Sequence, residues 1–275
     1  MNVAAAGLRN RLQNRLPLAY GVSGPLASPL FSQREVAALI SAAKDVGITI
    51  FDTSPSYGAG EGERRLGAAL VGDDTAFVMT KVGIESVGVL KKQRSFAPPS
   101  IRRSVEASLQ NLNRDRIDLL WIHGPARSEL SDELFLCLDA LNTEGKVESF
   151  GIVSRDAALQ KYADKPPFTA YMAPVGGGTS NTEPLPAETT RFGIECLKGV
   201  RAESRMQFGR SDLWRALRSA VRREKTIGAP KLSAKDAFSF AFGKAKCDVI
   251  LTTTTRKDRL QENAQLCRDV HPSFK

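Results

Sequence analysis

The chain has 275 residues, of which 42% are hydrophobic and 25% charged, the balance of an ordinary globular protein. No run approaches the ~18 apolar residues of a membrane-spanning helix, and residues 1–16 lack the apolar core of a secretory signal. We therefore expect a cytoplasmic protein with no membrane partner. The net charge of +9 leaves nucleic acid or an anionic ligand open as a partner.

Short apolar segments recur along the chain and alternate with segments of helical periodicity. Continuous apolar runs are typical of parallel strands that are covered on both faces. The expected strands are Leu16–Val22, Ile48–Asp52, Ala76–Thr80, Ile117–Ile122, Val147–Val153, Phe168–Ala173, Gly193–Leu197 and Asp248–Thr252. Strand then helix, repeated about eight times within ~250 residues, predicts a (β/α)8 TIM barrel, with an open doubly wound sheet as the alternative. No low-complexity linker divides the chain, so we expect one domain over residues 1–275.

Local signals mark several of the helices and loops. Ser32 followed by Glu35 is a capping-box pattern that predicts a helix start. Ser131 predicts the start of a later helix, and Gly145 its end. The segment Val175–Thr190 contains three consecutive glycines and is expected to be a loop in place of a helix.

Three consecutive strands end in titratable side chains. Asp52 ends the second strand, and Tyr57 follows it in a loop that Pro55 stiffens. Lys81 follows the third strand and His123 the fourth. In a TIM barrel the C-terminal ends of the strands form the active site, and adjacent strands lie about 4.8 Å apart. We therefore expect these four groups to converge and to transfer a proton.

Other polar residues suggest no second site. The four cysteines have no short paired spacing, and Cys137 and Cys247 lie in apolar segments, so we expect buried, reduced thiols and no metal site. Positive charges with helical spacing lie between Arg215 and Lys225, opposite an apolar face. The interleaved aromatic residues of a single-strand binder are missing there. We interpret this segment as a solvated helix face and predict no nucleic-acid partner.

A series of motifs in this order resembles the aldo-keto reductases. The motifs are Asp-Thr-Ser-Pro-Ser-Tyr-Gly at 52–58, Met-Thr-Lys at 79–81, Ile-Asp-Leu-Leu-Trp-Ile-His at 117–123, Phe-Gly-Ile-Val-Ser at 150–154 and Ile-Leu-Thr-Thr-Thr-Thr at 250–255. The sequence around Tyr57 is most similar to that of the bacterial branch that includes aldose and pyridoxal dehydrogenases. The resemblance implies a TIM barrel that binds NADP(H) or NAD(H) without a Rossmann domain, and no Gly-x-Gly-x-x-Gly motif opens a helix here.

The resemblance implies an oxidoreductase for a small carbonyl or alcohol substrate. Tyr57 would be the general acid when a carbonyl is reduced, because the Lys81 ammonium favours ionisation of its phenol. Asp52 would hold Lys81, and His123 would orient the carbonyl oxygen. The nicotinamide would supply the hydride.

The resemblance also implies a set of cofactor-binding residues. They are Ser154, Arg155, Leu197, Thr253, Thr254, Arg259, Glu262 and Asn263. Ser154 would contact the nicotinamide amide and Asn263 the adenine, while the two threonines would lie at the ribose phosphate. Arg259 would meet a 2′-phosphate, which favours NADP(H) over NAD(H), and Arg256 is a second candidate.

Four departures from the family pattern concern the nicotinamide and the substrate pocket. Arg155 follows Ser154 at the position where the family commonly has Asn. The family also has a Gln in its sixth strand against the nicotinamide amide, and Phe168–Tyr171 contains none. Glu195–Lys198 lacks a stacking aromatic, which leaves Leu197 to pack there. The chain ends soon after Asn263, so we expect the loop that often closes the pocket to be absent.

These departures leave two alternatives beside an NADP(H)-dependent carbonyl–alcohol oxidoreductase. The same site could oxidise a sugar hemiacetal or a pyridoxal-like alcohol with NAD or NADP. Alternatively, the chain could be a weakly active or non-catalytic NADP-binding regulatory protein.

Overall fold

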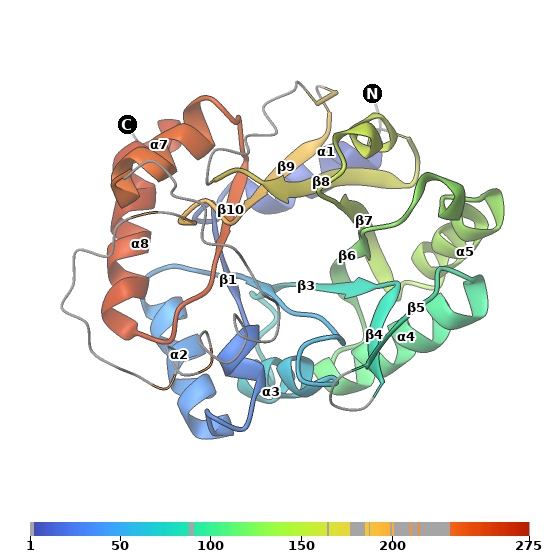
Figure 1. Ribbon diagram of the computed structural model, residues 1–275, viewed down its shortest axis with the longest axis horizontal. Coiled ribbons are helices and arrows are strands. Elements are labelled where there is room, and N and C mark those ends of the chain that lie inside the picture. The colour runs from blue at the N-terminus through green and yellow to red at the C-terminus, as the bar shows by residue number, and fades with distance from the viewer. Residues whose placement is uncertain are drawn as a thin grey trace.

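In the computed structural model, eight parallel strands close into a barrel that helices surround (Figure 1). The structure describes residues 3–87, 91–163, 165–176, 185–186, 188–198, 200, 210, 214 and 232–274. Around the barrel the strands follow the order β1-β10-β9-β8-β7-β6-β3-β2. They are β1 (Leu18–Gly21), β2 (Ile50–Asp52), β3 (Phe77–Val82), β6 (Ile117–His123), β7 (Val147–Val153), β8 (Phe168–Pro174), β9 (Thr190–Ile194) and β10 (Val249–Thr252). The predicted TIM barrel is confirmed.

Helices follow most of the strands and cover the outside of the barrel (Figure 1). The α-helices on this outer side are α2 (Gln33–Asp45), α3 (Glu61–Ala69), α4 (Pro98–Leu112), α5 (Asp132–Thr143), α7 (Ala234–Gly243) and α8 (Lys257–Val270). Short 3-10 helices are η1 (Gly24–Ala27), η2 (Arg127–Glu129), η3 (Ala157–Tyr162) and η4 (Pro272–Phe274). The predicted capping box is present at α2, where Ser32 and Glu35 each bond the other's backbone N–H.

An N-terminal helix, α1 (Val3–Leu12), closes the N-terminal mouth of the barrel. Its Leu8 belongs to the apolar cluster inside the barrel. Its Arg11 forms ion pairs with Asp118 near the start of β6 and with Glu148 near the start of β7, the latter at 2.7 Å. The sequence analysis did not predict this helix, because its apolar periodicity is weak. Because α1 covers the N-terminal mouth, the strand ends at the C-terminal mouth are the expected place for chemistry.

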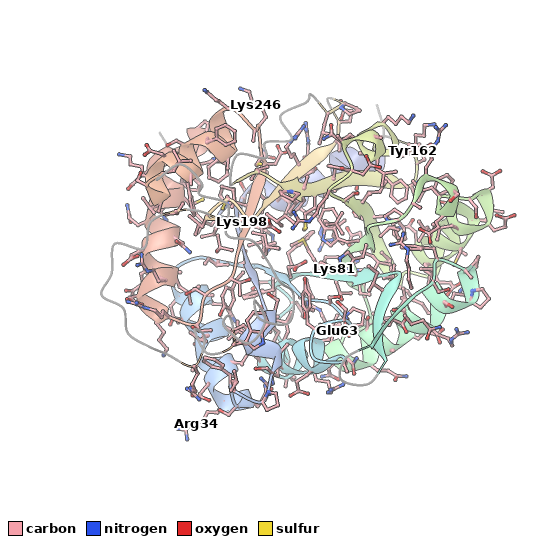
Figure 2. All side chains as sticks on the ribbon, viewed as in Figure 1. Arg34, Glu63, Lys81, Tyr162, Lys198 and Lys246 are labelled. Carbon is pink, nitrogen blue, oxygen red and sulfur yellow. The ribbon has the colours of Figure 1, made fainter. Side chains whose placement is uncertain are left out.

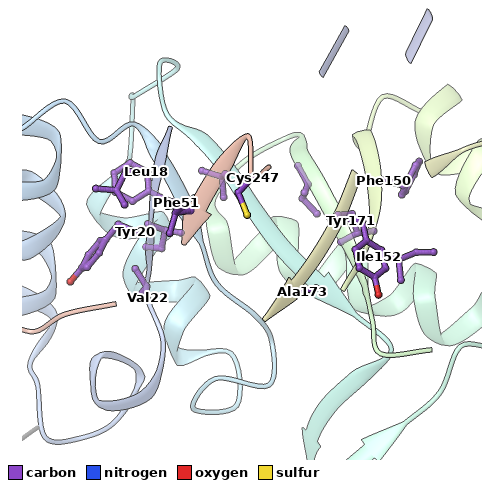
Figure 3. Close-up of a cluster of buried hydrophobic side chains, with 14 of the residues drawn as sticks. Leu18, Tyr20, Val22, Phe51, Phe150, Ile152, Tyr171, Ala173 and Cys247 are labelled. Atoms are coloured by element: carbon purple, nitrogen blue, oxygen red, sulfur yellow. The ribbon is translucent and has the colours of Figure 1, made fainter. Parts of the chain in front are cut away.

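The barrel interior is a packed core, and side chains fill it (Figure 2). Trp121 of β6 meets Phe192 of β9 edge to face, with ring centroids 5.0 Å apart. Gly151 of β7 leaves the space that the Trp121 ring occupies, since a Cβ there would lie 2.6 Å from its Cε3 atom. A second apolar cluster lies between the strands and the helices, as Figure 3 shows for Tyr20, Phe51 and other outward-facing residues.

Three segments differ from the sequence prediction. The seventh strand is Thr190–Ile194 rather than Gly193–Leu197, because Glu195 adopts a left-handed conformation (φ 58°) that ends it. The segment after β3 contains an antiparallel pair that was not among the expected strands, β4 (Ile84–Val87) and β5 (Lys91–Arg94). The connection between β7 and β8 contains η3 instead of an α-helix.

Two expectations fall outside the described residues. Most of the predicted loop Val175–Thr190 lies there, as does the basic segment from Arg215 to Lys225. The four cysteines are all described, and each is a buried free thiol, as predicted. Across the described ranges, no helix is long and apolar enough to cross a membrane, and no three His, Cys, Asp or Glu side chains gather as metal ligands would.

Candidate active site

The strand register brings three of the predicted residues to one mouth of the barrel. Asp52 of β2 is level with Met79 of β3, and Lys81 is level with Trp121 of β6. His123 ends β6 two residues beyond Trp121. Residues two apart on a strand point the same way, and Met79 and Trp121 belong to the interior cluster. Asp52, Lys81 and His123 therefore point into the C-terminal mouth.

Asp52 and Lys81 form a buried ion pair. The Lys81 Nζ atom donates to both carboxylate oxygens of Asp52 at 2.6 Å and to the backbone oxygen of Thr53 at 2.8 Å. The two side chains are only 1% and 4% exposed. Burial raises the pKa of Asp52, which the Lys81 ammonium opposes. Burial alone would lower the pKa of Lys81, but Asp52 and Tyr57 outweigh it and raise that pKa. Lys81 is thus held as an ammonium.

Tyr57 lies beside this ammonium. The Lys81 Nζ atom is 5.1 Å from the centre of the Tyr57 ring, and the two side chains hydrogen-bond. Backbone bonds shape the loop, since Tyr57 donates its N–H to Ser54 and accepts from the N–H of Gly62 in α3. Gly58 has a φ of 61° and lies so close to the Ala27 carbonyl that a side chain would not fit.

The arrangement joins a phenol to a buried ammonium at the C-terminal mouth of the barrel. A phenol in this position can give up a proton and can carry the resulting negative charge next to Lys81. His123, half-buried on the neighbouring strand, can donate or accept a hydrogen bond at the same mouth. The structure thus gathers around Lys81 the groups that the sequence predicted, while their catalytic roles stay predictions.

The predicted phosphate residues Thr253 and Thr254 follow β10 directly. The Thr253 hydroxyl lies 3.3 Å from that of Ser23, in the loop after β1. The Tyr20 hydroxyl donates to the Thr254 backbone oxygen at 2.7 Å, which fixes this turn to β1. Gly21 leaves room for the Thr253 side chain, because a Cβ at residue 21 would lie 2.6 Å from the Thr253 hydroxyl oxygen.

The start of α8 carries the other predicted cofactor residues. Arg256 pairs with Asp258, and Arg259 pairs with Glu262 at 2.6 Å. Both guanidinium groups stand at the N-terminal end of the helix, where the backbone N–H groups also favour an anion. Asn263 is 6% exposed, on the buried face of α8.

The residues predicted at the nicotinamide show an unexpected ion pair. Ser154 follows β7, and its hydroxyl accepts from the Asp156 N–H at 3.0 Å. Arg155 reaches across the end of β8 to form an ion pair with Glu195, which follows β9. Leu197, no longer a strand residue, packs against the outer apolar cluster.

Sequence reasoning missed Glu195 and a second acidic residue, Glu63. Both are remote in sequence from the residues they meet, so no local motif could have revealed them. Glu63 on α3 is fully buried against β3, the strand of Lys81. The sequence contains only a weak indication of Glu63, namely that a second carboxylate follows Glu61 by two residues, shortly after Tyr57.

Comparisons with known proteins agree with this geometry. The Aldo/keto reductase family model matches residues 22–174. The chain is 35% identical over 178 residues to D-threo-aldose 1-dehydrogenase from a Pseudomonas species. This match covers 55% of this chain and 52% of that protein. It is 34% identical over 125 residues to NADH-specific methylglyoxal reductase from Escherichia coli, covering 40% and 38%. These matches span about half the length of the curated relatives, or less.

Solved structures agree on the fold. An aldo-keto reductase from Bacillus halodurans in its holo form superposes with a TM-score of 0.70 at 19% identity, covering 91% of this chain and 86% of that one. At this identity the likeness concerns the fold alone. The family model, in contrast, spans more than half of the chain, from the end of β1 to the end of β8. The chain belongs to the aldo/keto reductase family.

Proposed function

We propose that this protein is an NADP(H)-dependent oxidoreductase that interconverts a carbonyl and an alcohol, with Tyr57 as the proton donor. The observation that carries the proposal is the buried Lys81 ammonium. Asp52 holds it at 2.6 Å and it hydrogen-bonds with Tyr57 at the C-terminal mouth of the barrel. Burying an ion pair contributes little to stability, because the desolvation of both charges offsets their attraction. A role in chemistry therefore explains this pair better, and its ammonium contacts the phenol of Tyr57.

Each side chain has a distinct task in carbonyl reduction. The Tyr57 hydroxyl gives its proton to the carbonyl oxygen, and the Lys81 ammonium stabilises the negative charge left on the phenol. Asp52 keeps Lys81 charged and in place. His123 orients the carbonyl oxygen from the neighbouring strand. A nicotinamide held at this mouth would supply the hydride. In alcohol oxidation the proton moves the opposite way, to Tyr57.

The residues after β10 fit the phosphate end of such a dinucleotide. Threonine hydroxyls, the N-terminus of a fourteen-residue helix and two arginines, Arg256 and Arg259, are suited to phosphate oxygens. At the nicotinamide end, Arg155, which forms an ion pair with Glu195, stands where the family commonly has an asparagine. Ser154 and this pair are the groups of the chain that would hold the nicotinamide amide.

A second function is favoured by the similarity to D-threo-aldose 1-dehydrogenase. The same residues would then oxidise a sugar hemiacetal or a pyridoxal-like alcohol, with NAD or NADP as acceptor. A third, a non-catalytic NADP-binding protein, follows if the Arg155–Glu195 pair weakens the hold on the nicotinamide.

The test combines binding with turnover. NADPH and NADH are titrated by fluorescence against the wild type and Tyr57→Phe, and both are assayed with aldehydes, ketones, aldoses and pyridoxal in both directions. We expect NADPH to bind both proteins, and turnover to be lost only in Tyr57→Phe. Unchanged kcat in that variant would refute the mechanism. NADPH binding without wild-type turnover on any substrate would favour the non-catalytic alternative.

A further inference from the structure

Glu63 is a fully buried carboxylate that the proposed mechanism leaves unused. It lies in the first turn of α3, the helix that begins just after the Tyr57 loop, and is 0% exposed. Figure 2 labels Glu63 of α3 and Lys81 of β3. Burying an ionised carboxylate is costly unless hydrogen bonds or an opposite charge stabilise it.

Hydrogen bonds tie Glu63 to both of the elements that carry the proposed proton-transfer pair. The Thr80 hydroxyl, on the residue just before Lys81, donates to one carboxylate oxygen at 2.6 Å. The Asn111 amide of α4 donates to the other at 3.1 Å. One residue before Glu63, the N–H of Gly62 donates to the Tyr57 backbone oxygen at 3.1 Å. These bonds, with the Lys81–Tyr57 hydrogen bond, form a closed ring of contacts.

Glu63 and Lys81 are close enough for their charges to interact. Burial raises the pKa of Glu63, and the bonds from Thr80 and Asn111 and the charge of Lys81 oppose the rise. The side chains that bond Glu63, which include Thr80 and Asn111, are neutral. A glutamine could therefore form comparable hydrogen bonds without the cost of burying a charge. Lys81, on the other side of the strand, is a cation that benefits from that charge.

The elements packed around Glu63 leave Lys81 as the main charged neighbour. On the described part of α4, the residues facing it are the neutral Ser108 and Asn111, while α2 and η1 contribute buried apolar side chains. On α3 itself, Glu61 pairs with Arg64 and Arg65 at 3.0 and 2.7 Å. Beyond Lys81 lies Asp52, already bonded to it.

We propose that Glu63 is a positioning residue for the Lys81–Tyr57 pair, which it acts on in two ways. It fixes the helix after Tyr57 to the strand of Lys81, and its buried charge helps retain the proton that the pair shares. The proposal rests on the proposed function for its catalytic meaning, but the proton affinity of the pair can be measured without substrate or cofactor.

The test is a titration of Tyr57 by tyrosinate absorbance in the near ultraviolet. The signal of Tyr57 is the difference between each protein and the same protein with Tyr57→Phe. Removing a nearby negative charge makes loss of a proton easier, so Glu63→Gln should lower the midpoint by roughly half a pH unit or more. Glu63→Asp, which keeps the charge, should restore most of the wild-type midpoint.

Asp118→Asn is the matched control. Asp118 is also a buried carboxylate, 4% exposed, but it pairs with Arg11 at the opposite mouth of the barrel. Its loss should leave the Tyr57 midpoint unchanged. An unchanged or raised midpoint in Glu63→Gln, or an equal shift in Asp118→Asn, would overturn the proposal. Glu63→Met, which also removes the charge, replaces the glutamine variant if that protein does not fold.

Activity provides an independent readout. If the wild type reduces a carbonyl, the alkaline limb of its kcat profile should move in Glu63→Gln in the same direction and by a similar amount as the Tyr57 midpoint, with unchanged NADPH affinity. A wild type without turnover refutes the proposed function, while the absorbance titration still decides the role of Glu63.

Discussion

Replacing Lys81 with methionine should show how much the buried ion pair contributes to stability. Lys81→Met keeps most of the side-chain volume and removes the ammonium. Asp52, 1% exposed, would then be a buried carboxylate without its cation, and the Thr53 carbonyl would lose the hydrogen bond that it accepts at 2.8 Å. Removing one partner of a buried ion pair typically costs about 3–5 kcal/mol. We expect a loss of about 4 kcal/mol in the free energy of unfolding at neutral pH.

The pH dependence of that loss follows from Asp52. Burial raises the pKa of its carboxyl, and without Lys81 nothing at that position opposes the rise. A carboxyl whose pKa is higher in the folded than in the unfolded state costs stability at a pH above both values. This cost falls as the pH drops from the folded value to the unfolded value, below which it is gone. The difference between Lys81→Met and the wild type should therefore narrow at mildly acidic pH.

Urea unfolding followed by circular dichroism measures these differences. The double variant Asp52→Asn/Lys81→Met removes both charges and should recover most of the lost stability. Lys198→Met is the control, because Lys198 is 66% exposed and its pair with Glu195 is a surface contact of 3.3 Å, for which we expect a change within about 0.5 kcal/mol. Equal losses in the single and double variants, or a loss independent of pH, would refute the argument.

Two further predictions concern packing and a surface ion pair. Gly151→Ala places a Cβ against the Trp121 ring, 2.6 Å from its Cε3 atom, and 3.0 Å from the Ala170 carbonyl oxygen, so overpacking should cost about 1–3 kcal/mol. A melting temperature equal to that of the wild type would contradict this. Burial alone would raise the pKa of Asp73, but the Lys44 ammonium 2.6 Å away and the two hydrogen bonds from Thr75 outweigh it, and the pKa falls to about 2. A lowered carboxyl pKa stabilises the fold above the unfolded value of about 4. Asp73→Asn should therefore cost about 1 kcal/mol at neutral pH, after allowance for solvent screening, and the cost should shrink as the pH falls below 4. A constant difference in urea midpoints across that range would exclude the ion pair as its source.

The convergence of Asp52, Lys81 and His123 could be predicted because it needs little beyond strand order. In a parallel barrel the C-terminal ends of neighbouring strands meet at one mouth, so residues far apart in sequence share a site once their strands are recognised. Tyr57 follows Asp52 within one tight loop, and local backbone bonds keep it there. Short-range rules were therefore sufficient for these four groups.

The seventh strand could not be placed in the same way. Hydrophobicity favoured Gly193–Leu197, whereas the strand begins at Thr190 and includes the buried Arg191. The Arg191 backbone N–H donates to the Asp248 carboxylate at 2.7 Å, so a partner 57 residues away in sequence stabilises a polar segment inside the barrel wall. Intrinsic strand preference is weak compared with such tertiary contacts.

The sequence by itself determined the barrel, the capping box at Ser32 and the order of the titratable groups at the strand ends, because alternation, caps and strand order are local properties. Only the tertiary structure decided that Glu63 lies behind Lys81 and that Arg155 pairs with Glu195. Those contacts join helices and loops whose relative positions follow from how the whole chain packs. A carboxylate shows no sign in the sequence of whether folding will leave it in water or bury it beside an ammonium.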